Sequence, residues 1–322
     1  MRRRLLIAAP LALAAPRLRA QGATERFPDR PIRVLVPFGP GGNADTLVRI
    51  LAPKLNELLG QSIIVENRPG GGGAIAGQAV AQAAADGHTL LFDSFGFVVT
   101  PILVRSLPPT YERAFVPVAN AVATPYVLAV RRGYPAQTLP AFIEHVKANP
   151  GLPYGTPGAG TVGHLAGALL ASQAGIRLEH APYRGGADVA RDMAAGVLDC
   201  GIITWSSLRP IVEDGRVVPL AVTGTGLGGP TAAIKPIAEQ GFPGFDLTSW
   251  NGLFAPVATP RPILDRLDAA LRAAVSDPAT QQRIRPTGNE PMPEDSATFT
   301  ARILRDREQV RRIVAETGMR ID

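Results

Sequence analysis

The sequence predicts an α/β fold of two lobes with a hinge and a central cleft, and two observations indicate it. Short apolar runs alternate with amphipathic stretches in two separate parts of the chain, as expected for sheets whose faces are covered by helices. Two long extended segments, 116–130 and 247–256, lead from the first part to the second and back. Two α/β lobes joined by two such crossings can open and close about a hinge.

The first part of the chain alternates strands and helices. The apolar run 32–37 predicts a buried strand, and leucines recur on one face over 44–59 as in an amphipathic helix. A strand at 62–66, a helix at 74–85 and a strand at 89–93 follow in the same way. This βαβαβ order implies a parallel sheet with helices on its faces.

The middle part repeats this layout, although it shares no convincing sequence repeat with the first. Its predicted helices cover 139–147, 161–173 and 187–195, and its predicted strands cover 154–156, 178–182, 198–204 and 218–223. The same logic of strands alternating with helices predicts a second sheet of its own.

The chain is predicted to be helical after Pro260, with apolar stripes over 263–275 and 299–315. Because no strands accompany these two helices, we expect them to pack on the first lobe. The predicted first lobe is therefore 24–122 plus 250–322, and the predicted second lobe is 123–249.

Residues 1–20 have the layout of a bacterial export signal, with five arginines, no acid, an apolar stretch and a possible cut after Ala20. They hold five of the six net positive charges, so the basic balance gives no indication of nucleic-acid binding. The stretch is shorter than the ~18 apolar residues of a membrane span. We expect a periplasmic protein, and the arginines leave the general and the twin-arginine export routes both open.

A glycine-rich turn, 37–45, links the first predicted strand to the first predicted helix. The N–H groups that begin a helix have no intrahelical acceptor, and the helix dipole favours negative charge there. Such a turn can hold a carboxylate without a cationic side chain. A second glycine-rich turn, 155–164, has the same setting in the second lobe, with Thr161 as its expected N-cap. Two such turns on opposing lobes could hold one carboxylate between them.

Several side chains near these turns have two possible roles. His164 could contact a ligand or cap and pack its helix, and Asp45 could select an amino group or complement the helix dipole. Arg184 could pair with a distal carboxylate or stand exposed on the lobe. Trp205 follows a strand, where it could form a pocket wall or pack within the lobe. The amides of 70–73 could contact the ligand or only open a helix.

The sequence lacks the residue sets that most enzymes need. Its four histidines show no zinc spacing, and neither a Gly-x-Ser-x-Gly nucleophile motif nor a phosphate-binding Gly-Lys-Ser/Thr occurs. The single cysteine, Cys200, is expected in a buried strand. Residues 158–163 fit the dinucleotide pattern Gly-x-Gly-x-x-Gly with Glu179 beyond it, so a dinucleotide-binding oxidoreductase is a weak alternative. We expect no catalytic residue, no metal and no cofactor.

Short motifs along nearly the whole chain after the leader match those of one known family. They lie at 28–32, 36–45, 65–70, 86–90, 164–167, 182–185, 221–223 and 249–256. On these motifs the chain resembles the extracytoplasmic substrate-binding proteins of the tripartite tricarboxylate transporters, the Bug or TctC-like receptors. The resemblance implies a type II periplasmic-binding fold that closes on an organic acid.

In that family the loops that match 37–45 and 156–164 act as two pincers, and backbone amides and ordered water hold a carboxylate. The resemblance and the turns together give these expected ligand contacts: Phe38, Gly41, Gly42, Asn43, Asp45, Ser94, Thr156, Gly160, Thr161, His164, Arg184 and Trp205. The chain departs from the family at Trp205, where members often have small or acidic residues, and at 186–188. Trp205 could favour a flat or aromatic acid by stacking.

The expected function is that of a receptor without catalysis. It would capture a small organic acid, whether a di- or tricarboxylate, an aromatic acid or an amino acid, and present it to membrane transporter subunits. We expect a monomer, the usual state of a clamshell receptor. A secreted sensor or an enzyme on the same fold are the alternatives.

Overall fold

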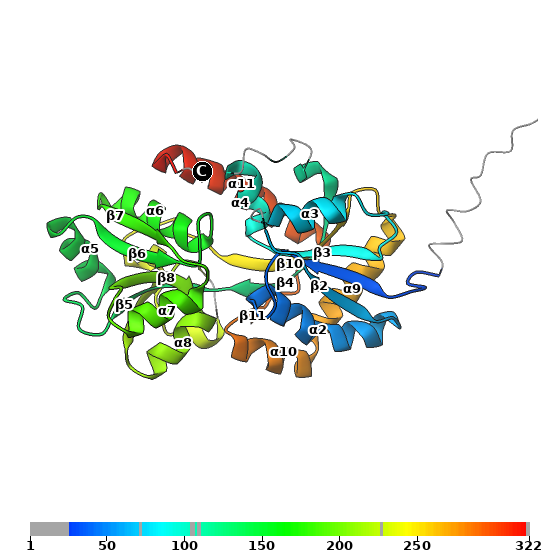
Figure 1. The fold of residues 1–322 in the computed structure, drawn as a ribbon, viewed down its shortest axis with the longest axis horizontal. Helices are drawn as coiled ribbons and strands as arrows, with labels where there is room; N and C mark the ends of the chain where they lie inside the picture. Colours follow the sequence, from blue (N-terminus) through cyan, green and yellow to red (C-terminus); the bar gives the residue numbers. More distant parts are fainter. Residues whose placement is uncertain (1–25, 71–72, 104–106, 108–110, 226–227, 320–322) are drawn as a thin grey trace, which may run out of the picture.

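The computed structural model describes residues 26–70, 73–103, 107, 111–225 and 228–319, and it contains two sheets that lie side by side, each covered by helices. In Figure 1 the first lobe is drawn mainly in blue, cyan and orange, and the second lobe in green. The α/β class and the two-lobe layout predicted from the sequence are confirmed. The predicted export signal, 1–20, lies outside the described residues.

The first sheet has the strand order β2-β1-β3-β10-β4-β11. Its strands are β1 (Ile32–Val36), β2 (Ile63–Asn67), β3 (Thr89–Ser94), β4 (Phe115–Thr124), β10 (Ser249–Pro256) and β11 (Glu290–Pro291). β1 pairs in parallel with β2 and β3, whereas β10 runs antiparallel to β3 and β4. The predicted βαβαβ unit therefore forms the parallel half of this sheet.

The second sheet has the order β7-β6-β8-β5-β9. Its strands are β5 (Tyr126–Arg131), β6 (Leu152–Thr156), β7 (Leu178–Pro182), β8 (Cys200–Thr204) and β9 (Val217–Val222). β6 pairs in parallel with β7 and β8, and β5 runs antiparallel to β8 and β9. Each sheet contains three parallel strands, β1 to β3 or β6 to β8, of which the second lies at the edge and is followed by the first and the third. The next strand in each sheet, β10 or β5, is the one that arrives from the other lobe. The lobes share this topology although their sequences do not repeat.

The two predicted crossings are strands of the sheets. Only Pro125 separates β4 in the first sheet from β5 in the second, and β10 returns the chain to the first sheet. The chain therefore passes from one lobe to the other at these strands, and we expect a hinge at their ends. The exact division at 122/123 and 249/250 stays a prediction.

Helices cover both sheets. Those of the first lobe are α2 (Asn43–Leu59), α3 (Ala74–Ala81), α4 (Gly96–Leu103), α9 (Arg261–Ser276), α10 (Pro278–Ile284) and α11 (Ser296–Thr317). Those of the second are α5 (Leu139–Ala148), α6 (Val162–Ala174), α7 (Gly186–Ala194) and α8 (Trp205–Glu213). The predicted helix 74–85 is too long, because it ends at Ala81. The sequence analysis missed α4, α8 and α10.

The C-terminal helix α11 contacts both lobes. It packs on β4 and α4 of the first lobe and on α6 of the second, and Figure 1 shows it lying above both. Its buried Ile303 and Ile313 belong to one apolar cluster with Leu165 of α6. The expectation that this helix packs on the first lobe was therefore incomplete, because its apolar stripe is long enough to reach across the hinge.

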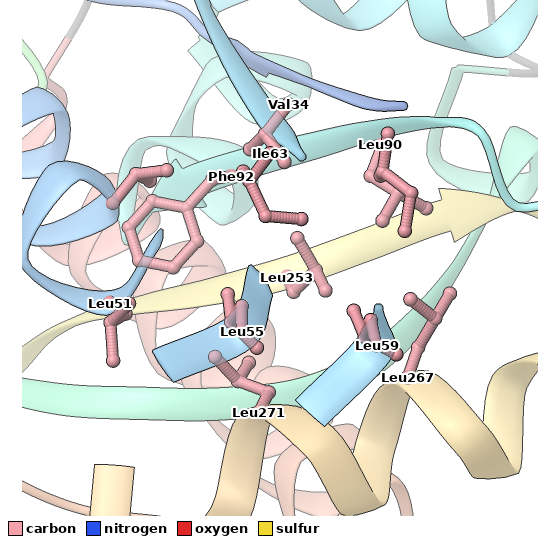
Figure 2. A pocket seen from close by; sticks show the side chains of 12 residues that line it. Val34, Leu51, Leu55, Leu59, Ile63, Leu90, Phe92, Leu253, Leu267 and Leu271 are labelled. Atoms are coloured by element: carbon pink, nitrogen blue, oxygen red, sulfur yellow. The ribbon is translucent and has the colours of Figure 1, made fainter. Parts of the chain in front are cut away.

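A small cavity of about 20 Å³ lies inside the first lobe between the sheet and helices α2 and α9. Figure 2 shows its lining, which includes Leu55, Leu90, Leu253 and Leu271. All of its lining side chains are apolar, and such a space is dry core rather than a site for a polar ligand.

Candidate functional site

The first loop, residues 37–42, joins β1 to α2. Helix α2 begins after the N-cap Gly42, which has no side chain to cap the free N–H groups of the first turn. Gly41 has φ +78°, in the left-handed region that glycine adopts without strain. The helix start therefore presents unpaired donors and the positive end of the dipole, as an anion site requires.

Asp45 shapes the first loop from inside. Its carboxylate is 2% exposed and accepts hydrogen bonds from Gly41 N–H (2.9 Å), Arg49 Nε (3.0 Å) and Asn67 Nδ2 (3.0 Å). Asn67 Nδ2 also donates to the carbonyl of Phe38 (3.0 Å). Burial alone would raise the pKa of Asp45, but the hydrogen bonds from Arg49, Gly41 and Asn67 outweigh it and hold that pKa below its usual value. Asp45 is thus an ionised carboxylate whose oxygens are engaged within the loop.

Asn43, the first residue of α2, turns its side chain toward the hinge strands. Its Nδ2 lies 3.1 Å from Asn251 Oδ1 on β10, and its Oδ1 accepts from Asn289 Nδ2 (2.7 Å). Thr124, the last residue of β4, donates to Asn289 Oδ1 (2.6 Å). Thr124, Asn251 and Asn289 are all buried. This network, which the sequence analysis missed, ties the start of α2 to both hinge strands.

Two further predicted contacts lie on the first lobe. Ser94 ends β3 and is half-buried, and its Oγ accepts from Gly96 N–H (3.3 Å). Phe38 is 37% exposed on the first loop. Asp93, which precedes Ser94 in β3, is buried, and the sequence analysis did not single it out. Burial raises its pKa to about 7, although the Ser94 N–H donates a hydrogen bond to its carboxylate.

The second loop, residues 156–161, joins β6 to α6. Thr161 is the N-cap as predicted, and its Oγ1 accepts from His164 N–H (3.5 Å) while donating to Gly158 O (2.8 Å). Gly160, with φ +73°, donates its N–H to Nδ1 of His164 (3.2 Å). The loop is therefore held by local hydrogen bonds, both among its own residues and between them and the first turn of α6.

His180 on β7 completes the second loop. Its Nε2 lies 2.7 Å from Oγ1 of the buried Thr156, and its ring stacks on that of His164 with centroids 3.6 Å apart and planes 6° from parallel. Burial, and for His164 also the neighbouring His180, lowers the pKa of both imidazoles to about 4. Both rings are therefore neutral at pH 7. The sequence showed His180 as an isolated histidine, and only its place on β7, the strand that pairs with β6, could have linked it to the loop.

Arg184 and Trp205 lie elsewhere on the second lobe. Arg184 is exposed, and it has no ion pair among the residues that the structure describes. Trp205 is the first residue of α8 and is 8% exposed. Its backbone N–H donates a hydrogen bond to Pro125 O (3.0 Å). Its indole Nε1 is buried and unpaired within the described part of the chain. Stacking of Trp205 on an aromatic ligand stays a prediction.

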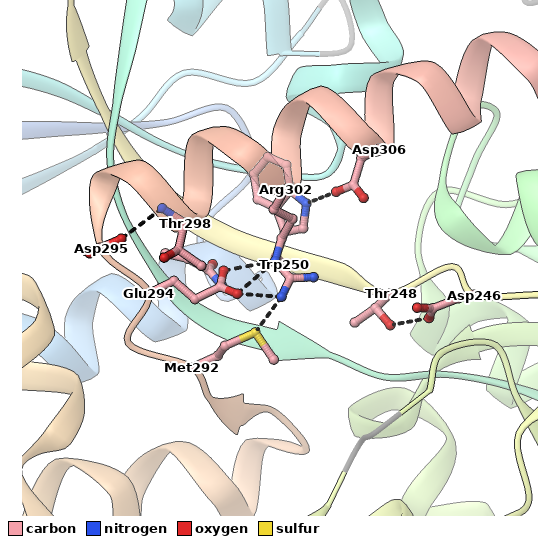
Figure 3. Close-up of polar contacts among 10 residues, drawn as sticks. Asp246, Thr248, Trp250, Met292, Glu294, Asp295, Thr298, Arg302 and Asp306 are labelled. Atoms are coloured by element: carbon pink, nitrogen blue, oxygen red, sulfur yellow. Dashed lines mark hydrogen bonds and ion pairs between the residues drawn. The ribbon is translucent and has the colours of Figure 1, made fainter.

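A larger groove of about 580 Å³ lies apart from the two loops, between α11 and the segment that enters β10. Figure 3 shows residues of its wall, where Trp250 Nε1 donates to Asp306 (2.8 Å) and Arg302 pairs with Glu294. The groove is lined by Gly244, Asp246, Thr248, Arg302, Arg305, Asp306, Glu308, Gln309 and Arg312. None of the predicted ligand contacts is among them.

The described residues contain no group of three or more histidine, cysteine or acidic side chains that could hold a metal ion. Within the same residues, no helix combines the length and apolar character needed to cross a membrane. Buried Cys200 lies on β8, as expected for a strand residue, and burial raises the pKa of its thiol.

Comparison with known proteins shows which family the chain belongs to. The model of the tripartite tricarboxylate transporter family receptor, TctC, matches residues 47–319. The chain belongs to this family. Its members are solute-binding receptors rather than enzymes, in agreement with the sequence analysis.

Individual relatives agree with this assignment. A UPF0065 protein from the tcbD-tcbE intergenic region of Pseudomonas sp. strain P51 is 38% identical over 289 residues, which is 89% of this chain and 86% of that protein. Rpa4515 of R. palustris, solved with adipate, is 30% identical with a TM-score of 0.81 over 91% of this chain and 98% of its own. MatC of Rhodopseudomonas palustris, solved with malate, is 27% identical with a TM-score of 0.76 over 89% of this chain and all of its own.

Proposed function

We propose that this receptor binds a small organic carboxylate between its first and second loops and delivers it to the membrane subunits of a tripartite transporter. One observation carries the proposal. In each lobe a glycine turn leads from a strand of the parallel ladder into a helix, and the turn is locked by contacts to the first turn of that helix. Two rigid helix starts, one on each lobe, suit an anion that the lobes close upon.

The charges near the loops support binding through backbone donors. Asp45 is compensated by Arg49, and the imidazoles of His164 and His180 are neutral at pH 7. The loops therefore offer backbone N–H groups rather than charged side chains. A carboxylate at a helix start needs no cationic partner, because the dipole and the free donors already favour it.

We further propose a dicarboxylate as the first class to test, since the adipate and malate of the two solved relatives are both dicarboxylic acids. Arg184 is an exposed cation on the second lobe that could pair with the distal carboxylate. Aromatic and amino acids, which the sequence analysis also left open, belong in the same screen. The leader 1–20 and the family both support a periplasmic location, and we propose that the receptor is a monomer.

A thermal-shift titration with malate, adipate, benzoate and aspartate tests the proposal. A ligand at 100 times its Kd adds about 2.7 kcal/mol of stability, which raises the Tm of a protein of this size by roughly 2–4 °C or more. A dose-dependent shift with one of these acids is the expected result. No shift with any of them, and a shift with nicotinamide dinucleotide instead, would reverse the proposal in favour of the dinucleotide alternative.

A matched pair of cap variants locates the site. Thr161 caps α6 at the second loop, and Thr138 caps α5 through the same kind of bond to Ala141 N–H (3.3 Å) away from both loops. Thr161→Val and Thr138→Val should each cost about 1 kcal/mol of stability. Only Thr161→Val should weaken carboxylate binding. Equal affinities for both variants would place the ligand away from the second loop.

A further inference from the structure

The two loops are built on the same local pattern. In the first loop, Gly41 N–H donates to the side chain four residues on, Asp45 (2.9 Å). In the second loop, Gly160 N–H donates to the side chain four residues on, His164 (3.2 Å). A carboxylate and an imidazole nitrogen thus play the same part, which is to accept the glycine N–H and fix the turn before the helix.

Each of these two acceptors is held by a residue of the neighbouring edge strand. Asn67 ends β2 and donates to Asp45 (3.0 Å), and His180 lies on β7 and stacks on His164. β2 and β7 occupy the same place in their sheets, since each pairs in parallel with the strand that leads into its loop. Asn67 also reaches the first loop directly through Phe38 O, and His180 reaches the second loop through Thr156. The two residues thus play corresponding parts on corresponding strands, although Asn67 lies opposite the last residue of β1 and His180 lies opposite Tyr154, two residues before the end of β6.

Thr156 Oγ1 lies within hydrogen-bond distance of both Gly158 O (3.0 Å) and His180 Nε2 (2.7 Å). We assign the hydroxyl hydrogen to the bond with Gly158 O, so that Oγ1 accepts from His180 Nε2. A neutral His180 with hydrogen on Nε2 satisfies this geometry. His180 therefore contacts both ends of the second loop. It bonds to Thr156 at the start of the loop and stacks on His164 just beyond its end.

We propose that His180 is the positioning residue of the second loop, the counterpart of Asn67 at the first. It sets the ligand-ready geometry of the loop through the Thr156 hydroxyl and the His164 ring. This inference rests on the proposed function, since it concerns how well the same loop binds a carboxylate. It adds to the expected contacts a residue that neither the motifs nor the composition indicated.

Among the residues that the structure describes, the His180 side chain has no other hydrogen-bond partner than Thr156. Tyr154 on β6 lies beside its ring, with centroids 5.3 Å apart, and the Tyr154 hydroxyl donates to the carbonyl of His164. The adjacent Glu179 points to the opposite face of the strand and pairs with Arg177 (2.9 Å). Cys200 on β8, the strand that also pairs with β6, is buried with a raised thiol pKa, so it carries no charge at pH 7. The Thr156 contact and the His164 stack therefore define what His180 does.

Three substitutions separate this role from a general effect on folding. His180→Phe keeps an aromatic face for His164 but cannot donate to Thr156, whereas His180→Gln keeps an N–H donor. His145→Phe is the control, because His145 also contacts an aromatic ring, that of Tyr134 on the second lobe, away from the loops. Calorimetry with malate and adipate measures Kd, thermal melting measures stability, and hydrogen exchange measures the protection of Gly160 N–H without any ligand.

His180→Phe should weaken binding about 5-fold, as expected for the loss of one hydrogen bond of about 1 kcal/mol. His180→Gln should stay within about twofold of the unmodified protein, and His145→Phe should leave Kd unchanged. Gly160 N–H should exchange faster in His180→Phe and not in His145→Phe.

Unchanged affinity and unchanged Gly160 exchange in His180→Phe would overturn the positioning role, and so would an equal loss in His180→Gln. If the unmodified protein binds neither acid, the proposed function fails for these ligands. The exchange of Gly160 N–H then still decides whether His180 holds the loop.

Discussion

The indole Nε1 of Trp250 donates a hydrogen bond to the carboxylate of Asp306 at 2.8 Å, joining hinge strand β10 to helix α11. Gln309, one turn further along α11, donates to the carbonyl of Asp246 (2.7 Å), just before the same strand. Since α11 also packs on α6, the helix that begins at the second loop, it contacts both lobes as well as strand β10 between them. The hinge of this receptor therefore includes its C-terminal helix.

Asp306 should make stability fall as the pH rises. Burial raises its pKa to about 6, against the lowering effect of the Trp250 hydrogen bond and of Arg302. The folded state thus favours the protonated carboxyl, so stability is lost between about pH 4 and pH 6, by an amount on the order of 3 kcal/mol. Asp306→Asn keeps an acceptor for Trp250 and should remove this loss, measured as Tm from pH 4.5 to 8. Glu308→Gln, in the same groove, should leave the curve as it is, and identical curves for both variants would refute the assignment.

The stacked histidines should act in the opposite direction, at acid pH. Their pKa values of about 4 lie below the usual value of 6.5, so the folded state binds fewer protons than the unfolded one. Stability is therefore fully present above pH 6.5 and falls as the pH drops toward 4. His180→Gln removes one of the two titrating rings and should make the acid limb of unfolding less steep than in the unmodified protein. His145→Gln serves as the control, and a limb of unchanged slope in His180→Gln would count against the buried neutral pair.

Gly163 should tolerate no side chain. A Cβ at this position in the first turn of α6 would lie 2.3 Å from the backbone carbonyl oxygen of Ile202 on β8, which cannot rotate away. Gly163→Ala should therefore lower the free energy of unfolding by about 2 kcal/mol or more, through forced separation of α6 from its sheet. Gly39, which has open space around it, gives the matched control Gly39→Ala. Chemical denaturation compares them, and equal stabilities would mean that α6 moves away at little cost.

Asn289 should matter for both stability and binding. It is 1% exposed and bonds to Asn43 and Thr124, so Asn289→Ala leaves buried polar groups without partners. The expected cost is about 2 kcal/mol, together with weaker carboxylate binding because the start of α2 loses its tie to the hinge strands. Asn149→Ala, at the exposed end of α5, is the comparison in the same denaturation and calorimetry experiments. An unchanged Kd in Asn289→Ala would show that the network contributes to stability and not to carboxylate binding.

The sequence predicted the elements whose signal is local. The helix expected at 44–59 appears as Asn43–Leu59, because its apolar spacing and the glycines at both ends are properties of that segment alone. The N-cap at Thr161 was predicted for the same reason. By contrast, α4 was missed because it is apolar all round and contains Pro101, so it has no amphipathic period to detect. α10 was missed because seven residues are too few for a period to emerge.

The sequence by itself determined the α/β class, the two crossings, the two glycine turns and the family. Periodicity, capping residues and motifs are local properties of the sequence, so they can be recognised within single segments. Only the tertiary structure decided which side chains hold those turns. Asn43 meets Asn289 across 246 positions, and Thr156 meets His180 from a different strand. The tertiary structure also decided that Trp205 is buried and that α11 packs on both lobes. Such contacts depend on which strands become neighbours in the sheets, and strand order is set by the packing of the whole chain rather than by any one segment.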